Sequence, residues 1–335
     1  MARPNAFRFF AALVCVVAAA LAASAAPGDE VALNEIARRY GLTASWSKAR
    51  REYQLCSRWT TLVFTVGSRE AEWNGFRLFL GESVVLRKDR LQLAMSDWLA
   101  IVRPLLDPAA VPAPGPLGLV VIDPGHGSPD PGTENRALGL QEKNVTLDVA
   151  HRLRKDLQSR GYRVLLTRET DAKLRPVQLE DLQYRAEKAN RAGADLFISL
   201  HFNSLPGYPK ISGIETYALT PAGQRSTAAA RRAAADAAAL PGNQQDHWNM
   251  VLTGALHRAL IGQLGAADRG LKHARFAVLR TVRCPAALIE AGFLSSPAEA
   301  RRIKDPAYRQ EIAEAIGDGI RDYDTRLRLA ARRVE

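Results

Sequence analysis

Three polar side chains stand at the ends of strongly apolar runs. His126 follows "LVVID", His201 closes "DLFISLH", and Glu290 closes "CPAALIE". These runs alternate with amphipathic segments near residues 142–160 and 179–192, a pattern typical of buried parallel strands joined by helices. Functional groups of such sheets gather beyond the carboxyl ends of the strands, so we expect the three side chains to lie close together.

A carboxylate lies where it could join the two histidines. Glu142 stands at the start of an expected helix, where unpaired N–H groups favour an acid, and that role alone would account for it. With His126 and His201 it forms the two-histidine, one-carboxylate set of many hydrolytic zinc sites, which keep a fourth position open. Zinc would lower the pKa of a water and polarise a scissile carbonyl. A separate general base is then needed, and Glu290 is the candidate.

The order of elements predicts an α/β domain at residues 117–325, with a mostly parallel sheet and helices on both faces, followed by a charged tail at 326–335. Residues 27–106 combine one helical pattern with short strand-like runs and predict a small α+β module. Between them, "DPAAVPAPGP" at 107–116 has the proline content of a linker. We expect the linker to make few contacts and the domain after it to fold independently.

Seven segments carry a resemblance to a known family. They are "VVIDPGHGSPDPGT", "GLQEKNVTLDVAHRL", "GYRVLLTRETD", "RAEKANRAGADLFISLHFNS", "GIETYAL", "DRGLKHARFAVLRTVRCPAALIEAGFLSSPAEA" and "IAEAIGDGI". In this order, from about Leu117 to Tyr323, they resemble the zinc-dependent N-acetylmuramoyl-L-alanine amidases, which are cell-wall hydrolases of bacteria. "DPGHG" alone is a weak signal, whereas the ordered set is a strong one.

The resemblance implies specific roles for the four residues already singled out. His126, Glu142 and His201 would bind one Zn²⁺ per chain, and Glu290 would be the catalytic base. The reaction would be hydrolysis of the amide between N-acetylmuramic acid and L-alanine of the peptidoglycan stem peptide. Two alternatives stay open: a zinc metallopeptidase acting within the stem peptide, and a wall-binding protein that has lost catalysis.

Two further side chains are candidates for binding substrate. Asn203 follows His201 by two residues and could face the same side, although a turn-forming asparagine is an equal alternative. Arg168, in "LLTRETD", could brace the site or the substrate through a carboxylate, and a purely structural ion pair is the alternative.

An alanine-rich segment, "STAAARRAAADAAAL" at 226–240, has strong helix propensity. In some members of the family an inserted helix at this place blocks the zinc until a partner protein removes it. The acids of the segment and its neighbourhood, Asp236 and Asp246, are not obviously poised to replace a zinc-bound water. We therefore favour a helix on the substrate side, and leave open an activating partner.

The module at 27–106 faintly resembles the amino-terminal repeat of copper amine oxidases. It contains no histidine and only Cys56, so it lacks good ligands for copper. A wall-binding role and a spacer role are both open.

The first 25 residues have the layout of a cleaved secretory signal peptide: arginines, an apolar run and a final "ASA". Its loss removes two arginines and no acid, which lowers the formal charge from +11 to +9. We expect an exported, periplasmic or wall-associated monomer without a stable membrane span. Its basic surface would suit peptidoglycan rather than nucleic acid. Cys56 and Cys284 are expected to be unpaired.

Overall fold

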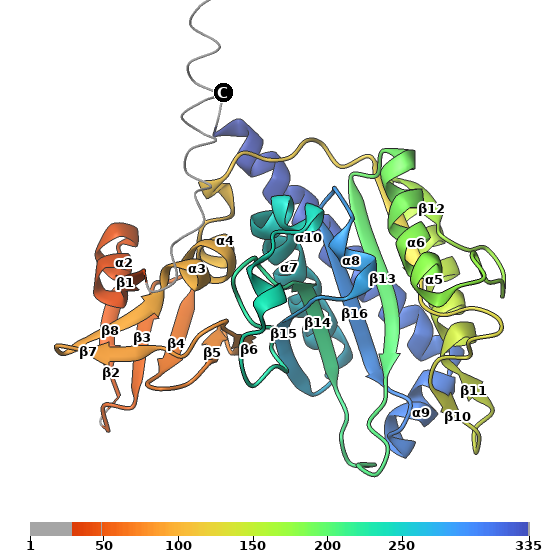
Figure 1. The fold of residues 1–335 in the computed structure, drawn as a ribbon, viewed down its shortest axis with the longest axis horizontal. Coiled ribbons are helices and arrows are strands. Elements are labelled where there is room, and N and C mark those ends of the chain that lie inside the picture. The colour runs from red at the N-terminus through yellow and green to blue at the C-terminus, as the bar shows by residue number, and fades with distance from the viewer. Residues whose placement is uncertain (1–28, 48, 334–335) are drawn as a thin grey trace, which may run out of the picture.

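The computed structural model describes residues 29–47 and 49–333, which form an α/β body around one long sheet (Figure 1). The eleven strands of this sheet follow the order β12-β9-β13-β16-β14-β15-β6-β5-β4-β3-β2. The six strands that follow the proline-rich segment occupy one end of it: β9 (Leu119–Pro124), β12 (Arg163–Leu166), β13 (Leu196–Asn203), β14 (Ile214–Leu219), β15 (Asp268–Ala274) and β16 (Ala286–Phe293).

Most neighbouring strands of this half run parallel, as the sequence predicts. β12, β9, β13 and β16 pair in parallel, and so do β14 and β15, whereas β14 and β16 pair antiparallel. A small hairpin of β10 (Glu134–Asn135) and β11 (Leu140–Gln141) precedes the first long helix. The carboxyl ends of β9, β13 and β16 therefore meet at one edge of the sheet.

Helices cover both faces of the sheet, and each face has its own apolar core. Val120 and Ile122 of β9 point into one core, and Val121 between them points into the other, as strand geometry requires. The first core is closed by α5 (Glu142–Ser159), α7 (Asp246–Leu264) and α10 (Pro306–Arg332), and the second by α6 (Gln178–Ala192) and α8 (Ala277–Arg280). The short helix α9 (Pro297–Lys304) follows β16.

The amino-terminal block is mainly an antiparallel meander. Its strands are β2 (Thr43–Trp46), β3 (Glu52–Cys56), β4 (Thr61–Thr65), β5 (Glu70–Trp73) and β6 (Phe76–Phe79). A second sheet of β1 (Glu30–Ala32), β8 (Arg90–Ala94) and β7 (Val85–Arg87) and the helix α2 (Leu33–Tyr40) pack on it. Helical turns follow at α3 (Met95–Asp97), at Trp98–Val102 and at α4 (Arg103–Leu106).

The two halves of the chain share one sheet. β6 pairs in parallel with β15, with Leu78 opposite Leu271. The backbone N–H of Arg77 donates to Asp268 Oδ2 over 2.7 Å. Leu271 and Met250 lie in the apolar core of the amino-terminal block, although both come after the linker in sequence. The described part of the amino-terminal block is thus packed against the half of the chain that follows the linker, through hydrogen bonds and buried apolar surface.

The expectation of a linker with few contacts is wrong. His247 Nε2 lies 2.8 Å from the carbonyl oxygen of Pro108, and the indole N–H of Trp248 donates to Pro112 O over 2.9 Å. Prolines cannot donate backbone hydrogen bonds but still present carbonyl oxygens, and side chains of α7 use these oxygens. The segment is therefore fastened along the domain surface.

The alanine-rich segment is not the predicted α-helix. The structure has one short 3₁₀ turn there, at Ala234–Ala237, and a second, Pro241–Gln245, directly follows the segment. Arg69, the residue before β5, donates to the carbonyl oxygens of Ser226, Thr227 and Ala229, at 3.2–3.4 Å. These carbonyls would otherwise accept helical hydrogen bonds, so tertiary contacts override the helix propensity of alanine here.

The carboxyl-terminal end of the chain differs from the prediction of a separate charged tail. The charged tail at 326–335 continues α10 as far as Arg332, with Leu327 and Ala330 buried, so most of it belongs to the domain.

The predicted signal peptide lies outside the described residues. Within the described parts, no helix is both long and apolar enough to cross a membrane. Cys56 and Cys284 are free thiols, as predicted.

Candidate metal centre

His126 is presented by a tight turn at the carboxyl end of β9. Its backbone is in the left-handed region, with φ 62°, and Gly127 follows with φ 144°. Such a conformation costs free energy in a non-glycine residue and persists only when its surroundings enforce it. Here Gly125 N–H donates to Leu200 O over 2.9 Å, and Arg185 donates to His126 O over 2.8 Å. The turn is therefore held from two sides, which fixes the direction of the imidazole.

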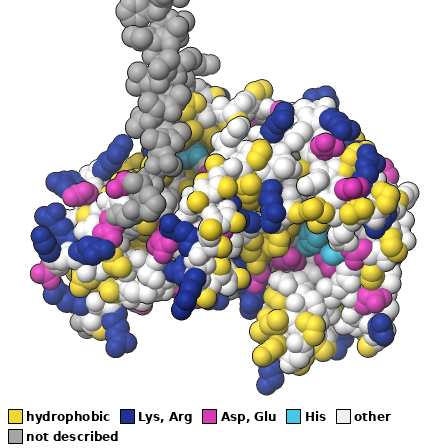
Figure 2. Space-filling model, viewed as in Figure 1, with side chains coloured by type: hydrophobic (Ala, Val, Ile, Leu, Met, Phe, Trp, Pro, Cys, Tyr) yellow, Lys and Arg dark blue, Asp and Glu magenta, His cyan; other side chains and the backbone are white. Residues whose placement is uncertain are grey.

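The three predicted ligands converge on one point. His126 Nε2 and His201 Nδ1 lie 3.1 and 3.0 Å from the same oxygen, Glu142 Oε1. One donor atom from each residue lies within 4.8 Å of the other two, a spacing that fits a metal ion. The two imidazole rings meet edge to face, with centroids 5.0 Å apart. Figure 2 shows histidine side chains beside acidic ones on one face of the molecule, above a notch in the surface.

The contacts around the cluster hold its ligands in place. Asp130 Oδ2 lies 2.8 Å from His126 Nδ1, so Nδ1–H donates to the carboxylate and Nε2 can act as a ligand. Glu142 accepts the backbone N–H groups of Thr133 and Phe202, at 2.8 and 3.0 Å. A Cβ at Gly132 would lie 2.6 Å from Glu142 Oε2, so the turn beside the cluster requires glycine.

Glu290 lies next to the cluster on the neighbouring strand. It is directly opposite His201 in the parallel pairing of β13 and β16. Its Oε2 is buried and has no hydrogen-bond partner among the described residues. An unpartnered buried carboxylate oxygen is costly in a purely structural residue. Its position and free oxygen therefore fit a group that accepts a proton from a molecule bound at the cluster.

The two carboxyl groups beside the histidines have opposite pKa shifts. Burial disfavours the charged form of Glu142, but hydrogen bonds from His126 and His201 outweigh it and hold its pKa well below the usual range. Burial, followed by repulsion from Glu142 and Glu215, raises the pKa of Glu290 well above its ordinary value. Glu142 is thus an anion suited to a cation, while Glu290 is suited to binding a proton.

Arg168 and Asn203 lie near the cluster but are already engaged. Arg168 is buried and donates to the backbone carbonyls of Pro124, Gly125 and Lys143 at 2.7–3.0 Å. It braces the backbone on both sides of the cluster from within, and its bonds go to carbonyl oxygens and the hydroxyl of Thr146 rather than to the expected carboxylate. Asn203 donates to Glu215 Oε2 over 3.0 Å, so its amide faces a protein carboxylate beside Glu290.

A second buried arginine supports the site without having been predicted. Arg185 pairs with Asp123 over 2.9 Å, and both side chains are almost wholly buried. Asp123 also accepts hydrogen bonds from Thr167 and Ser199, at 2.6 and 2.9 Å. The helix at 179–192 was predicted, and an arginine on its buried face was the available signal.

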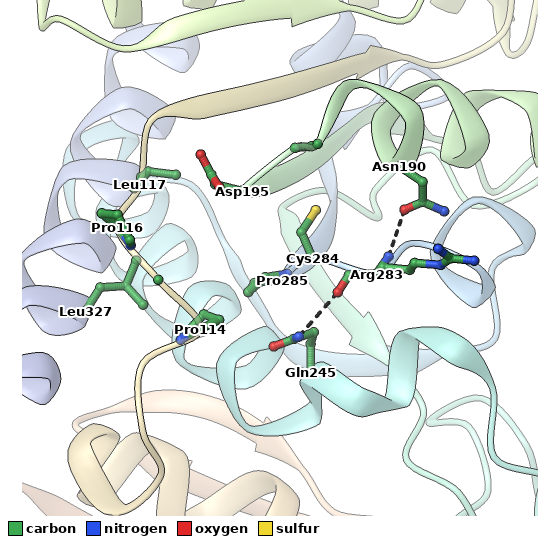
Figure 3. A pocket seen from close by; sticks show the side chains of 13 residues that line it. Pro114, Pro116, Leu117, Asn190, Asp195, Gln245, Arg283, Cys284, Pro285 and Leu327 are labelled. Carbon is green, nitrogen blue, oxygen red and sulfur yellow. Dashed lines mark hydrogen bonds between the residues drawn. The ribbon is translucent and has the colours of Figure 1, made fainter. Parts of the chain in front are cut away.

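Cavities open at both ends of the sheet strands. A narrow one of about 50 Å³ touches His126, Asp130 and His201 and extends to Gln178 and Lys173. A larger one of about 240 Å³ lies between the proline-rich segment, α6 and α10, at the amino end of β16 (Figure 3). There the Gln245 side chain donates to the carbonyl oxygen of Arg283, and the backbone N–H of Arg283 donates to the Asn190 side chain. These bonds connect three segments that line the cavity.

Comparison with known proteins identifies the family to which the chain belongs. The sequence model of the N-acetylmuramoyl-L-alanine amidases matches residues 120–322, more than half of the chain. The chain belongs to that family. The amidase hydrolyses an amide bond of peptidoglycan, which confirms the predicted enzyme class. The matched region contains all six predicted site residues and begins after the proline-rich segment.

Individual relatives agree with this assignment. The chain is 33% identical over 268 residues to the germination-specific N-acetylmuramoyl-L-alanine amidase of Bacillus subtilis, covering 77% of this chain and 96% of the relative. It is 32% identical to the amidase AmiA of Salmonella typhimurium, covering 62% of this chain and 77% of that protein. A crystal structure of a Clostridium difficile amidase superposes with a TM-score of 0.51 at 29% identity, covering 62% of this chain and 97% of the other.

Proposed function

We propose that this amidase is a zinc enzyme that cleaves the bond between N-acetylmuramic acid and L-alanine. His126, Glu142 and His201 bind one Zn²⁺, and Glu290 is the general base. The observation that carries the proposal is the convergence of both imidazoles on Glu142 Oε1, at 3.1 and 3.0 Å. Two neutral imidazoles and one carboxylate are a ligand set that zinc prefers, and they leave a fourth position for substrate or water.

The residues around the ion divide the chemistry between them. Bound zinc supplies Lewis-acid polarisation of the scissile carbonyl and lowers the pKa of the attacking water. Glu290 accepts the proton from that water and delivers it to the nitrogen of L-alanine as the carbon–nitrogen bond breaks. Asp130 keeps the imidazole of His126 in the tautomer that can bind the ion. Arg168 and Arg185 hold the backbone of the turn while the substrate is bound.

We propose that the amino-terminal block extends the catalytic domain and presents the wall polymer to it. The pairing of β6 with β15 supports a role in shaping the region beside the metal centre, because Phe79 of β6 contacts Lys272 of β15. In this proposal residues 27–106 and 117–325 are two segments of one domain, and the linker at 107–116 is hydrogen-bonded to its surface. A wall-binding role for the amino-terminal block would require a further binding surface on the outer strands of that block.

The substrate and the amino-terminal sequence pattern place the enzyme outside the cytoplasm in this proposal. It acts on peptidoglycan, in a periplasm or at the wall, as a monomer. One solved structure similar to this chain is that of the CwlD amidase from Clostridioides difficile in complex with the GerS lipoprotein. An activating partner is therefore part of the proposal.

Digestion of purified sacculi tests the proposal. Mass spectra of the products should show intact stem peptides with a free L-alanine amine, and cleavage should stop after chelation and resume on addition of zinc. Shortened stems would instead indicate a peptidase acting within the stem. Full activity in the presence of a strong chelator, with no metal in the protein, would contradict the metal assignment.

A further inference from the structure

A second carboxylate lies directly beside the proposed general base. Glu215 of β14 is opposite Glu290 in the antiparallel pairing of β14 and β16. Across the sheet, His201, Glu290 and Glu215 therefore occupy three successive strands, which are spaced roughly 5 Å apart. Glu215 is 3% exposed, so its charge must be compensated by neighbouring groups.

Four donors saturate the Glu215 carboxylate. Oε1 accepts from Arg269 Nε at 2.8 Å and from Lys272 Nζ at 2.7 Å. Oε2 accepts from the hydroxyl of Tyr217 at 2.6 Å and from the amide of Asn203 at 3.0 Å. A carboxylate with both oxygens doubly occupied is a poor proton acceptor, in contrast to Glu290. Glu215 is therefore a positioning residue, and what it positions is a pair of cations.

The positive charge of the two cationic side chains exceeds the negative charge of the carboxylate that binds them. Arg269 and Lys272 together carry two positive charges against one on Glu215, which leaves a net positive charge beside Glu290. The bond to Glu215 uses only Nε of Arg269, and its two terminal nitrogens have no hydrogen-bond partner among the described residues. The side chain is 28% exposed, so these nitrogens can reach a bound ligand.

Aromatic rings fix the orientation of both cations. The guanidinium of Arg269 lies over the ring of Phe293, 5.0 Å from its centroid. Lys272 Nζ lies 5.5 Å from the ring centroid of Phe79 and 5.9 Å from that of Tyr217. Cations held by rings and a buried carboxylate lose little conformational freedom on binding, which favours recognition of an anion.

We propose that Arg269 and Lys272 form a carboxylate-binding subsite for the stem peptide, held in place by Glu215. The proposal rests on the proposed site of cleavage. In the stem peptide, L-alanine is followed by a γ-linked D-glutamate whose α-carboxylate is about two residues of extended chain from the scissile amide, at roughly 3.5 Å per residue. Arg269 and Lys272 belong to β15, three strands from His201, but their charged ends bind Glu215 on β14, which is two strands or roughly 10 Å from His201. This distance is comparable with the reach of the stem beyond a carbonyl held at the metal centre, and a planar guanidinium suits a carboxylate.

A pair of substrates that differ in one charge tests the subsite. Two soluble muramoyl tripeptides are compared, one with the D-glutamate α-carboxylate and one with its amide. Wild-type protein should cleave the acid with a kcat/KM roughly 10- to 100-fold higher than that of the amide, as expected for a charge-assisted bond. Arg269→Gln and Lys272→Gln should each bring the ratio close to one, chiefly by raising KM for the acid.

The acid-to-amide ratio distinguishes recognition from a folding defect. A partly misfolded variant loses activity on both substrates by the same factor, so its ratio is unchanged. Arg258→Gln is the matched control, because this arginine pairs with Asp322 on α10 instead. A wild-type ratio near one, or an unchanged ratio in both variants, overturns the subsite. Chelator-resistant cleavage would overturn the metal assignment and still leave the ratio measurable, so the two failures are distinguishable.

Discussion

The carboxylate of Asp130 lies 2.8 Å from Nδ1 of His126, on the opposite side of the ring from Glu142. This contact selects the imidazole tautomer whose Nε2 lone pair faces the proposed metal. Asp130→Asn should therefore lower zinc affinity by about 10- to 100-fold. Competition with a chromogenic chelator measures the effect. Asp148→Asn is the control and should leave affinity unchanged, because the Asp148 carboxylate pairs with Arg152 of α5 and Arg309 of α10.

Glu290→Gln should abolish hydrolysis while zinc content stays near one per chain. Glutamine keeps the shape of the side chain but cannot accept the proton of the attacking water. A general base contributes roughly 10²-fold or more to the rate. Turnover of a soluble muropeptide and metal analysis of the same preparation measure both quantities, and turnover within about tenfold of wild type would exclude Glu290 as the base.

His126→Ala and His201→Ala should each lower zinc occupancy together with activity. Loss of one of three protein ligands weakens zinc binding itself, in addition to any effect on the reaction. Metal content after dialysis, measured alongside thermal stability, tests this. A fully metallated but inactive His201→Ala protein would move that histidine from ligand to catalytic group.

Removal of everything before Pro116 should destabilise the catalytic domain. Leu271 and Met250, both unexposed to solvent, would lose the apolar core that covers them, and Asp268 would lose its bond to Arg77. The shortened chain should show a lower Tm and reduced turnover of soluble fragments. A chain beginning at Asp29 is the control. Equal Tm and turnover for both would restore the view of residues 27–106 as a separate module.

Acidification should destabilise the protein partly through His247. Burial lowers the pKa of His247 to about 4, so the unfolded state binds its proton at a higher pH than the folded state. Stability from this residue is complete above about pH 6.5 and is lost as the pH falls toward 4. His247→Gln cannot be charged and should retain about 2 kcal/mol more of its neutral-pH stability at pH 5.

Urea unfolding at pH 7.5 and pH 5 measures that difference. His151→Gln is the control, because His151 is partly exposed and makes its contact with Glu169 O at the surface. An identical pH dependence for wild type and His247→Gln would contradict the assignment. The expected benefit is specific to acid, since the substitution also changes the contact with Pro108 at neutral pH.

Sequence reasoning predicted that His126, His201 and Glu290 lie close together because each follows a buried strand. His126, His201 and Glu290 each end an apolar run, and strand pairing brings such ends together. Glu215 lies within "GIETYAL", and the sequence alone does not predict a role for it, because one acid in a strand has no special spacing. Only the register of β14 against β16 reveals that it is opposite Glu290.

The linker and the alanine-rich segment were mispredicted for a common reason. Proline content and helix propensity are local properties, whereas the decisive partners lie far away in sequence. His247 forms a hydrogen bond with the linker carbonyl of Pro108, and Arg69 donates to the carbonyl oxygens of Ser226 and Ala229. Pairing of β6 with β15 is likewise a contact between segments about 190 residues apart, as the Arg77 to Asp268 bond shows.

The junction of β6 and β15 also decides which strand edge faces solvent. An uncovered strand edge is a template on which another chain can add, and proteins avoid leaving long ones open. β15 has seven residues, and β6 covers its outer side. Among the described residues, β2 is the last strand at this end of the sheet, and it has only four residues, including the polar Thr43 and Ser45. We therefore expect the amino-terminal block to protect the enzyme against self-association, and a proteolytic cut that released it should yield aggregation-prone protein.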